Sequence, residues 1–354
     1  MGGLSLSGKT STGRVLKAMQ DASENNVVMK VEDLKKYFPL KRSLIEMMLG
    51  RPQKILKAVD GVSLEVRHGE TVSLVGESGC GKSTLARTIL RLYDPDGGKI
   101  YFNGEDMTMV EGKRLRDQRT HFQMIFQDPY SSLNPKKTVR ETLGEVIKVH
   151  KLESGLTGKN AVEKRIFNLL DQVGLSHSVV DRTPSEFSGG QRQRIGLART
   201  LAVSPSFIIA DEPVSALDVS IQAQILNLLI EIQERNNLAF LFITHDLRVV
   251  RLISHRVAVM YLGRIVELSP TEDLYHSPAH PYTDVLIKAA PMLDTKNKNR
   301  EYAIEGDPPS PVDLPEGCRF HPRCPHVVNR CKEEEPLLRE LGEGRQVACH
   351  FPLR

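Results

Sequence analysis

A glycine-rich stretch between residues 76 and 84 has the residue types and spacing that bind phosphate groups. It reads Gly76-Glu-Ser78-Gly79-Cys-Gly81-Lys82-Ser83-Thr84, the pattern G-x-x-x-x-G-K-S. The apolar run 72–75 precedes it and apolar residues at helical spacing follow it, so we expect a strand, the loop and a helix in that order. Backbone amides and the helix N-terminus would then hold phosphate oxygens. Lys82 would reach the β- and γ-phosphates, and the Ser83 hydroxyl would bind Mg²⁺.

A pair of acidic residues, Asp211 and Glu212, follows the apolar segment 206–210, which is typical of a buried strand. Both carboxylates would lie at the carboxyl edge of a sheet, where α/β proteins bind ligands. One could hold Mg²⁺ while the next activates a water for attack on a γ-phosphate. Such a pair is otherwise a solvated turn, but the phosphate loop favours the catalytic interpretation. Lys82 and Asp211 lie 129 positions apart (211 − 82 = 129), which predicts a large insertion between two halves of one core.

Within that insertion, Ser188-Gly189-Gly190-Gln191 stands directly before the helical run 192–201. Two glycines at a helix N-terminus could form a second anion site. Ser188 could equally be an ordinary helix cap. Because one nucleotide needs only one phosphate loop, a second anion site would indicate a composite site shared by two subunits.

Taken in order along the chain, these motifs resemble those of ABC-type ATPases, and the resemblance covers roughly residues 27–270. It implies an α/β fold of the P-loop NTPase class. Such a fold has a RecA-like core, an antiparallel β subdomain and an inserted helical subdomain, here at about 130–192. The motifs that carry the resemblance are Gly76–Ser83, Gln127, Ser188–Gln191, Asp211-Glu212, Asp218 and His245.

The resemblance implies that one subunit binds ATP and Mg²⁺ on its phosphate loop. Phe38, in preference to its neighbour Tyr37, would stack on the adenine, and Thr84 would contact the α-phosphate. The ligands of Mg²⁺ would be Ser83, Gln127 and Asp211. The remaining residues that would contact nucleotide phosphates in this subunit are Gly76, Ser78, Gly79, Gly81 and Lys82.

The resemblance also assigns catalytic roles. Glu212 would be the general base, and His245 would contact the γ-phosphate and the attacking water. Gln127 would sense Mg²⁺ and that water at the face that meets a membrane partner, and Lys82 would stabilise the phosphates. The residues that would close on nucleotide bound by the opposite subunit are Ser188, Gly189, Gly190 and Gln191, with Asp218 linking the two sites.

The last part of the chain contains four of the five cysteines, Cys318, Cys324, Cys331 and Cys349. Their clustering favours a metal over disulfides in a cytosolic chain, but no C-x-x-C pair is present to favour zinc. The segments 280–283 (HPYT) and 317–325 (GCRFHPRCP) resemble the C-terminal extension of oligopeptide/dipeptide importer ATPases. That resemblance implies a [4Fe–4S] cluster on the four cysteines. Zinc, and free or disulfide-bonded thiols, remain alternatives.

Length and composition fit a two-domain globular protein. The 354 residues are 40% hydrophobic and 26% charged, and the net charge of +4 favours neither a nucleic-acid binder nor a membrane-surface polycation. No apolar run approaches the ~20 residues of a spanning helix, and no signal peptide is evident. We expect a flexible extension at 1–26, an ATPase domain at 27–275 with a basic surface insertion at 41–57, and a small irregular metal-binding domain at 276–354. The proline-rich texture after Pro270 places the boundary near 271–276.

The leading hypothesis is the ATP-hydrolysing subunit of a di- or oligopeptide importer at the cytoplasmic face of the membrane. The implied partners are a second ATPase subunit, for which we favour a paralogue, two permeases and an extracytoplasmic solute-binding protein. A nickel or other small-solute importer of the same group is an alternative. A soluble ABC ATPase acting on DNA or ribosomes would show heptads or two ATPase units, which this sequence lacks. A non-catalytic metal-sensing subunit conflicts with the intact Glu212 and His245.

Overall fold

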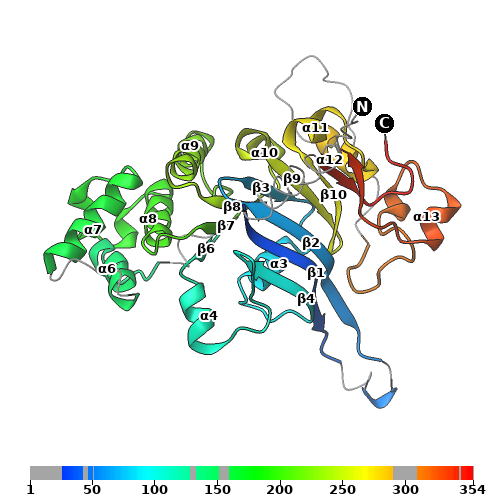
Figure 1. Ribbon diagram of the computed structural model, residues 1–354, viewed down its shortest axis with the longest axis horizontal. Helices are drawn as coiled ribbons and strands as arrows, with labels where there is room; N and C mark the ends of the chain where they lie inside the picture. The colour runs from blue at the N-terminus through cyan, green and yellow to red at the C-terminus, as the bar shows by residue number, and fades with distance from the viewer. Residues whose placement is uncertain are drawn as a thin grey trace, which may run out of the picture.

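The computed structural model describes residues 26–42, 47–50, 52–127, 133–150, 159–289, 309–342 and 344–353 (Figure 1). They form two sheets and a layer of helices. The extension predicted at 1–26 lies outside the described residues except for Asn26, as do residues 43–46 and 51 of the predicted insertion.

The larger sheet has eight strands among the described residues, in the order β11-β12-β10-β9-β3-β8-β7-β6. The strands from β9 to β6 run parallel, so their carboxyl ends share one edge. Every residue of β3, β7 and β8 is buried, as their continuous apolar runs predict. The bounds are β3 Thr71–Val75, β6 Phe122–Ile125, β7 Phe207–Asp211, β8 Ala239–Ile243, β9 Arg256–Tyr261, β10 Arg264–Pro270, β11 Arg339–Gly342 and β12 Arg345–Val347.

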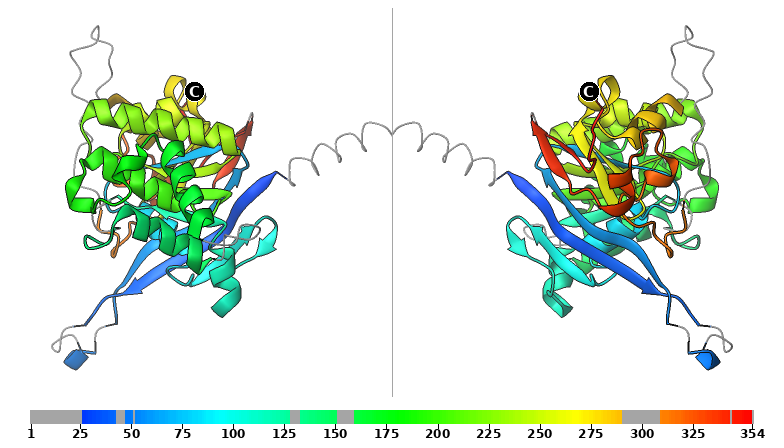
Figure 2. Two further views of the ribbon diagram at one scale, coloured as in Figure 1. Left: turned by 90° about the vertical axis from the view of Figure 1, so that its left-hand side faces the viewer. Right: turned by 90° about the vertical axis from the view of Figure 1, so that its right-hand side faces the viewer.

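A smaller antiparallel sheet in the order β2-β1-β4-β5 packs against one face of the large sheet through a shared core. Its two long strands form a hairpin that projects from the body of the molecule (Figures 1 and 2). Strands β4 and β5 form a second, short antiparallel hairpin. The bounds are β1 Val27–Pro39, β2 Ile55–Arg67, β4 Gly97–Phe102 and β5 Glu105–Asp106, followed by the helix α4 Gly112–Gln118.

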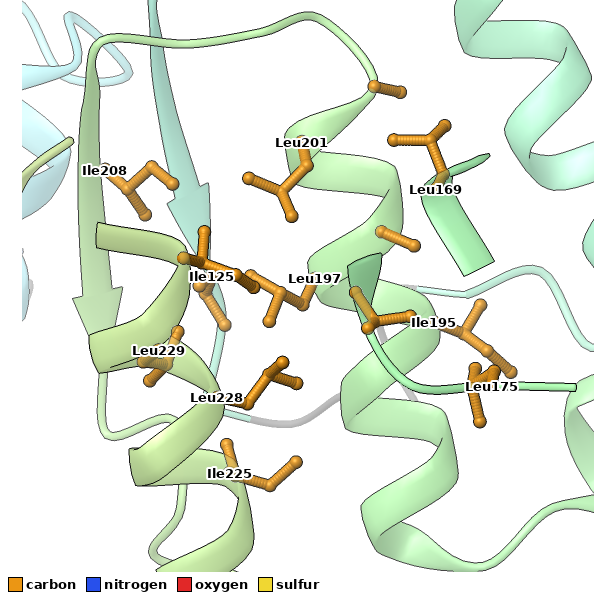
Figure 3. Close-up of a cluster of buried hydrophobic side chains, with 14 of the residues drawn as sticks. Ile125, Leu169, Leu175, Ile195, Leu197, Leu201, Ile208, Ile225, Leu228 and Leu229 are labelled. Carbon is orange, nitrogen blue, oxygen red and sulfur yellow. The ribbon is translucent and has the colours of Figure 1, made fainter. Parts of the chain in front are cut away.

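The insertion between the two halves of the core is helical, as predicted, and α8 joins it to the sheet. Leu197 and Leu201 of α8 point toward Ile125 and Ile208 on the strands, whereas Ile195 points toward the other helices (Figure 3). The apolar residues of α8 thus pack against both the sheet and the other helices of the insertion. The helices on this side are α6 Val139–Val149, α7 Lys159–Gln172, η1 His177–Val179, η2 Pro184–Glu186, α8 Gly189–Leu201 and α9 Val219–Asn236.

The C-terminal segment continues the large sheet, although the sequence predicts a separate small domain. Strand β12 pairs with β10 through Glu267–Val347 and Leu268–Gln346, and the predicted boundary at 271–276 is the helix α11. Tyr261, Tyr282 and Phe320 bury their rings together, so the extension shares a core with β9. The helices of this half are α3 Lys82–Ile89, α10 Leu247–Ile253, α11 Thr271–His276, α12 Pro281–Ala289, η3 His321–Arg323 and α13 Asn329–Glu333.

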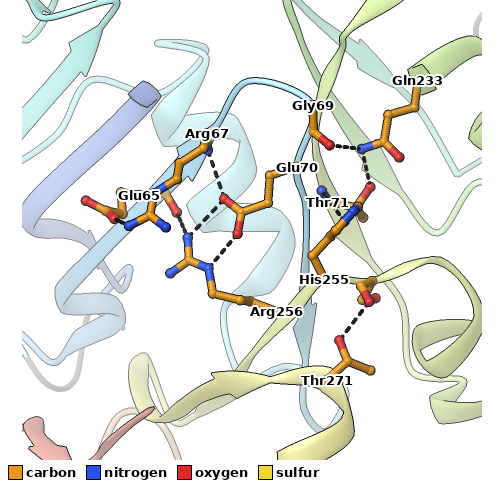
Figure 4. Close-up of polar contacts among 10 residues, drawn as sticks. Glu65, Arg67, Gly69, Glu70, Thr71, Gln233, His255, Arg256 and Thr271 are labelled. Atoms are coloured by element: carbon orange, nitrogen blue, oxygen red, sulfur yellow. Dashed lines mark hydrogen bonds and ion pairs between the residues drawn. The ribbon is translucent and has the colours of Figure 1, made fainter. Parts of the chain in front are cut away.

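Polar contacts fix the beginning of β3, the strand that carries the phosphate loop (Figure 4). Arg256 forms a two-pronged ion pair with Glu70, at 2.5 and 3.0 Å. The Gln233 amide donates to the Thr71 hydroxyl at 2.8 Å, and the Thr71 backbone N–H donates to His255 Nδ1 at 3.0 Å. These contacts come from β9, α9 and the residue before β9, so they anchor the strand from both sides. Each helix among the described residues is too short or too polar to span a lipid bilayer.

Candidate active site

The phosphate loop follows β3 and leads into α3, as predicted. Gly81 has φ 112° and begins the helix, and a Cβ there would lie 2.1 Å from the Ala58 carbonyl oxygen. Gly76 has φ 150°, and its Cβ would lie 2.1 Å from the Met260 carbonyl oxygen. Both positions therefore require glycine, because β2 and β9 approach the loop closely. The buried Lys82 ammonium donates to the carbonyl oxygens of Gly76 at 2.8 Å and Glu77 at 2.9 Å.

Asp211 lies at the carboxyl end of β7 and meets the first turn of α3. The Ser83 hydroxyl donates to its carboxylate at 3.2 Å, so the two predicted Mg²⁺ ligands are adjacent. Burial raises the pKa of Asp211, and the hydrogen bond from Ser83 offsets part of that effect. A buried carboxylate beside a hydroxyl is a donor set of the kind that Mg²⁺ accepts, because the cation would compensate the buried charge.

Glu212 lies at the centre of the predicted catalytic group. Its backbone adopts φ 47°, and its N–H donates to the Ile243 carbonyl of the neighbouring strand at 2.9 Å. Its carboxylate accepts the Gln127 amide at 3.0 Å on one oxygen and meets His245 Nδ1 at 3.1 Å on the other. The structure therefore brings together three residues from three separate strand ends. A carboxylate in this setting can take a proton from a water.

The residue predicted to stack on adenine, Phe38, lies near the end of β1. Its half-buried ring packs edge-on against Tyr93, with ring centroids 5.5 Å apart, and the Lys36 ammonium lies 5.5 Å from its centroid. The neighbouring Tyr37 instead donates its hydroxyl to Asp60. Phe38 is thus the more available of the two rings for a ligand.

Ser188 caps α8, which is one of the two interpretations that the sequence leaves open. The Gln191 N–H donates to the Ser188 hydroxyl at 3.4 Å, and the Ser188 N–H donates to the Gln191 side chain at 3.1 Å. Ser188 and Gly189 are exposed, whereas a Cβ on Gly190 would lie 2.5 Å from Ile221 Cγ2. The exposed Asp218 begins α9. Helix α8 lies in the helical layer, apart from α3 (Figure 1), so its N-terminus does not join the phosphate loop of the same chain.

The four C-terminal cysteines line one small cavity. Phe320 and Phe351 share that cavity with them, as do His321, His326 and His350. Burial raises the pKa of Cys318 to about 11 and also raises that of Cys324 and Cys349. The described part of the chain contains no group of three or more His, Cys, Asp or Glu side chains that could hold a metal ion. The predicted residues converge, but they form no ready-made site for a single ion.

Comparison with known proteins identifies the family. Residues 59–215 match the family model described as ABC transporter, and residues 266–331 match the one described as oligopeptide/dipeptide transporter, C-terminal region. The chain is 48% identical over 333 residues to the oligopeptide transport ATP-binding protein AppF of Bacillus subtilis, which covers 93% of this chain and 99% of that protein. The chain belongs to the ATP-binding subunits of the peptide ABC transporter family. It is an ABC transport ATPase.

Other members and solved structures agree with that assignment. The chain is 41% identical over 329 residues to the dipeptide transport ATP-binding protein DppF of Haemophilus influenzae, with 93% of this chain and 98% of that protein covered. Its fold matches the dimeric structure of a post-hydrolysis state of the ATP-binding cassette MJ0796 bound to ADP and Pi. The TM-score is 0.60 at 27% identity, over 69% of this chain and 98% of that chain. These comparisons confirm the predicted α/β ABC ATPase fold.

Several contacts between the C-terminal extension and the core of this ABC ATPase lie outside the sequence prediction. Arg323 forms an ion pair with Glu77 of the phosphate loop, and Arg319 forms one with Asp60 of β2. Both arginines lie in the segment 317–325, which carries the family resemblance. That motif marks the arginines as candidates for a role, but the sequence does not show which residues they contact. Tyr282, from the motif at 280–283, likewise accepts a hydrogen bond from the Glu77 backbone N–H at 2.9 Å.

Proposed function

We propose that this chain is the ATP-hydrolysing subunit of an importer that takes up di- and oligopeptides through partner permeases. The observation that carries the proposal is the contact of Glu212 with both Gln127 and His245, beside the Ser83–Asp211 pair. The names of the similar proteins and the match of residues 266–331 to the oligopeptide/dipeptide transporter model support a peptide substrate.

In this proposal the phosphate loop binds the phosphates of ATP. The backbone amides of Ser78, Gly79 and Gly81 face the phosphate oxygens, Lys82 contacts the β- and γ-phosphates, and Thr84 contacts the α-phosphate. Phe38 stacks on the adenine. Ser83, Asp211 and Gln127 hold Mg²⁺, which neutralises charge on the phosphate oxygens when bound. The 3.2 Å contact between Ser83 and Asp211 supports this ligand set.

Glu212 acts as the general base for the attacking water. Because it accepts hydrogen bonds from an amide and an imidazole, its carboxylate is held in place for that water. His245 contacts the γ-phosphate, and its side chain is 63% exposed, so a ligand can reach it. Gln127 links the water and Mg²⁺ to the face where a permease binds.

We further propose that two ATPase subunits share each site, with a paralogue as the second subunit. Ser188, Gly189, Gly190 and Gln191 would close on ATP bound by the opposite subunit, and Asp218 would connect the two sites. The exposure of Ser188 and Gly189, and the separation of α8 from α3, support this arrangement. ATP binding would close the pair and hydrolysis would reopen it, driving permeases from the cytoplasmic face of the membrane.

The test is transport by the whole complex. The chain, a partner ATPase, two permeases and the solute-binding protein are reconstituted in proteoliposomes, and uptake of a labelled tripeptide, a dipeptide and a nickel complex is measured with ATP. We expect ATP-dependent peptide uptake that Glu212→Gln abolishes. Uptake of nickel but neither peptide would overturn the peptide assignment, and ATP hydrolysis without any coupled uptake would favour a soluble ATPase.

For the cysteines, we propose a [4Fe–4S] cluster held by Cys318, Cys324, Cys331 and Cys349. Each thiolate of such a cluster binds a different iron, so the four sulfurs lie farther apart than the ligands of a single ion. Their common cavity among aromatic side chains supports this ligand set, although they form no single-ion site. Protein purified without oxygen should contain about four irons per chain and absorb visible light. Zinc in place of iron would overturn the assignment.

A further inference from the structure

The phosphate loop receives an ion pair from a part of the chain almost 250 positions away. We propose that Arg323 of the C-terminal extension is a positioning residue for this loop: it holds Glu77 and thereby sets the loop for ATP. By the same link, ATP binding orders the extension. The proposal rests on the proposed role of Gly76–Ser83 in binding phosphate.

The ion pair between Arg323 and Glu77 is bidentate. The Arg323 guanidinium donates from Nη1 to one Glu77 oxygen at 2.9 Å and from Nη2 to the other at 3.0 Å. Nη1 also meets the Tyr261 hydroxyl at 3.3 Å. Paired donation of this kind fixes both the distance and the orientation of the carboxylate. The Arg323 side chain is 6% exposed, so water screens the pair poorly and the arginine has little freedom to move away.

Glu77 is held at three points, each of which leads to a different element. Its side chain meets Arg323, and its backbone N–H donates to the buried Tyr282 hydroxyl of α12 at 2.9 Å. Its carbonyl oxygen accepts the Lys82 ammonium at 2.9 Å and the Cys80 N–H at 3.3 Å. A rotation of the Glu77 peptide would therefore move the group that orients Lys82. This is how an arginine that lies outside the loop can affect phosphate binding.

The opposite end of the link lies among the cysteines. Arg323 ends the short helix η3, its N–H donates to the Phe320 carbonyl at 3.0 Å, and the next residue is Cys324. Phe320 packs against Tyr261 and Tyr282, with centroids 5.4 and 5.3 Å apart. The extension and the loop thus share packed side chains and hydrogen bonds. Because coupling between two sites is reciprocal, an extension that stabilises the ATP-binding conformation is itself stabilised by ATP.

The experiment measures ATP affinity and hydrogen exchange on the full-length chain. Binding of ATP without Mg²⁺ is titrated for the wild type, Arg323→Gln, Arg323→Lys, Glu77→Gln and the double variant R323Q/E77Q. Arg330→Gln is the matched control, because it removes an arginine from the same extension whose ion pair with Glu334 is 57% exposed on both sides. Exchange of the amides of residues 318–331 is followed with and without ATP.

We expect Arg323→Gln and Glu77→Gln each to weaken ATP binding about tenfold, and the double variant to resemble either single change, because the pair acts as a unit. Arg323→Lys should recover part of the loss, since it keeps the charge but not the paired geometry. In steady-state assays of the complex, KM for ATP should rise more than kcat falls. ATP should slow exchange in residues 318–331 in the wild type and in Arg330→Gln, but not in Arg323→Gln.

The outcomes separate the two proposals. If Lys82→Ala binds ATP like the wild type, the proposed role of the loop fails. If Lys82→Ala loses binding while Arg323→Gln and Glu77→Gln keep wild-type affinity and protection by ATP, the positioning role is overturned. Should Arg323→Gln or Glu77→Gln fail to fold, R323Q/E77Q decides, because it leaves neither charge buried without its partner, and wild-type ATP affinity in that variant would overturn the positioning role. Strictly additive losses in the double variant would also contradict the link.

Discussion

Glu77 in the phosphate loop and Glu212 at the end of β7 are both held by neighbouring side chains, but their partners differ. Glu77 is held by a buried guanidinium in a paired geometry. Glu212 meets an amide and an imidazole, and that imidazole side chain is 63% exposed. Arg323 thus occupies both oxygens of Glu77 and holds that carboxylate in the fold, whereas the partners of Glu212 are the residues that would also contact the attacking water in the proposed mechanism. The partners of these two glutamates, more than their positions, thus separate a structural carboxylate from the proposed catalytic one.

The strongest test of this comparison removes the Glu212 charge. Glu212→Gln keeps a side chain of the same size but cannot take a proton from water, so ATP hydrolysis should fall by about 10²–10⁴-fold. ATP binding should be retained within about threefold, because Glu212 does not contact the phosphate loop in the proposed arrangement. Hydrolysis by the purified complex and equilibrium ATP binding check both parts. Near-wild-type hydrolysis in this variant would remove Glu212 as the general base.

The second prediction concerns the buried ion pair between Arg319 of the C-terminal extension and Asp60 of β2. Asp60 accepts hydrogen bonds from Arg319 and Tyr37, and both ionic side chains are at most 8% exposed. Asp60→Asn would remove the buried partner of Arg319 and leave that guanidinium with Glu335 alone, 3.0 Å away and 34% exposed, which should lower the free energy of unfolding by about 1.5–3 kcal/mol. Urea denaturation of the full-length chain measures this loss.

The matched control for Asp60 is an exposed pair that also joins the β2 side to the extension. Lys54 and Asp313 are 3.0 Å apart with side chains 59% and 68% exposed. Lys54→Gln should therefore change the free energy of unfolding by only about 0–1 kcal/mol. Equal losses from the two variants would show that burial does not distinguish these pairs.

The third prediction distinguishes a helix-capping role of Ser188 from a role in ATP hydrolysis. Thr138 caps α6 with the same reciprocal geometry that Ser188 uses on α8. Ser188→Ala and Thr138→Ala should each lower the free energy of unfolding by about 1 kcal/mol. If Ser188 also contacts ATP of the opposite subunit, its variant alone should lose about tenfold or more in hydrolysis by the complex. Parallel losses of activity in both variants would reduce Ser188 to a helix cap.

The local parts of this fold were predictable, because neighbouring residues carry their signals. The strand, loop and helix around Lys82 follow from one contiguous pattern, and the buried strands β7 and β8 follow from continuous apolar runs. Helix α8 begins at Gly189, earlier than the predicted 192, because the glycines of its first turn add no apolar periodicity. The proximity of Gln127, Glu212 and His245 was expected through the family resemblance.

Long-range pairings were not predictable. Arg323 and Glu77 lie 246 positions apart (323 − 77 = 246), and the strand pair Glu267–Val347 spans 80 (347 − 267 = 80). A single sequence shows the period and polarity of a segment, but it does not name the partner of an arginine or of an edge strand. For this reason the sequence predicts a separate irregular domain for the extension and gives no role to its arginines.

The smallest predicted effect concerns two buried aspartates, Asp60 and Asp211, whose pKa values shift in opposite directions. Burial alone would raise the pKa of Asp60, but hydrogen bonds from Tyr37 and Arg319 outweigh it and hold that pKa below its ordinary value. Its stabilising contribution is therefore complete above about pH 4 and is lost as the pH falls through the folded-state pKa. For Asp211, burial raises the pKa despite Ser83, so the folded state favours the protonated form and loses stability as the pH rises through that pKa.

At pH 7 these opposite shifts should give opposite results on neutralisation. Asp211→Asn should raise the free energy of unfolding, by less than the loss expected at Asp60, while hydrolysis falls because Asn is a weaker Mg²⁺ ligand. The gain should disappear in denaturation measured below about pH 4, where the wild-type Asp211 is itself protonated. A loss of stability in Asp211→Asn at pH 7 would mean that this carboxylate, like Asp60, holds the fold together. If Asp211→Asn gains stability while it loses ATP hydrolysis, the buried Asp211 charge lowers the stability of the wild type and is needed to bind Mg²⁺.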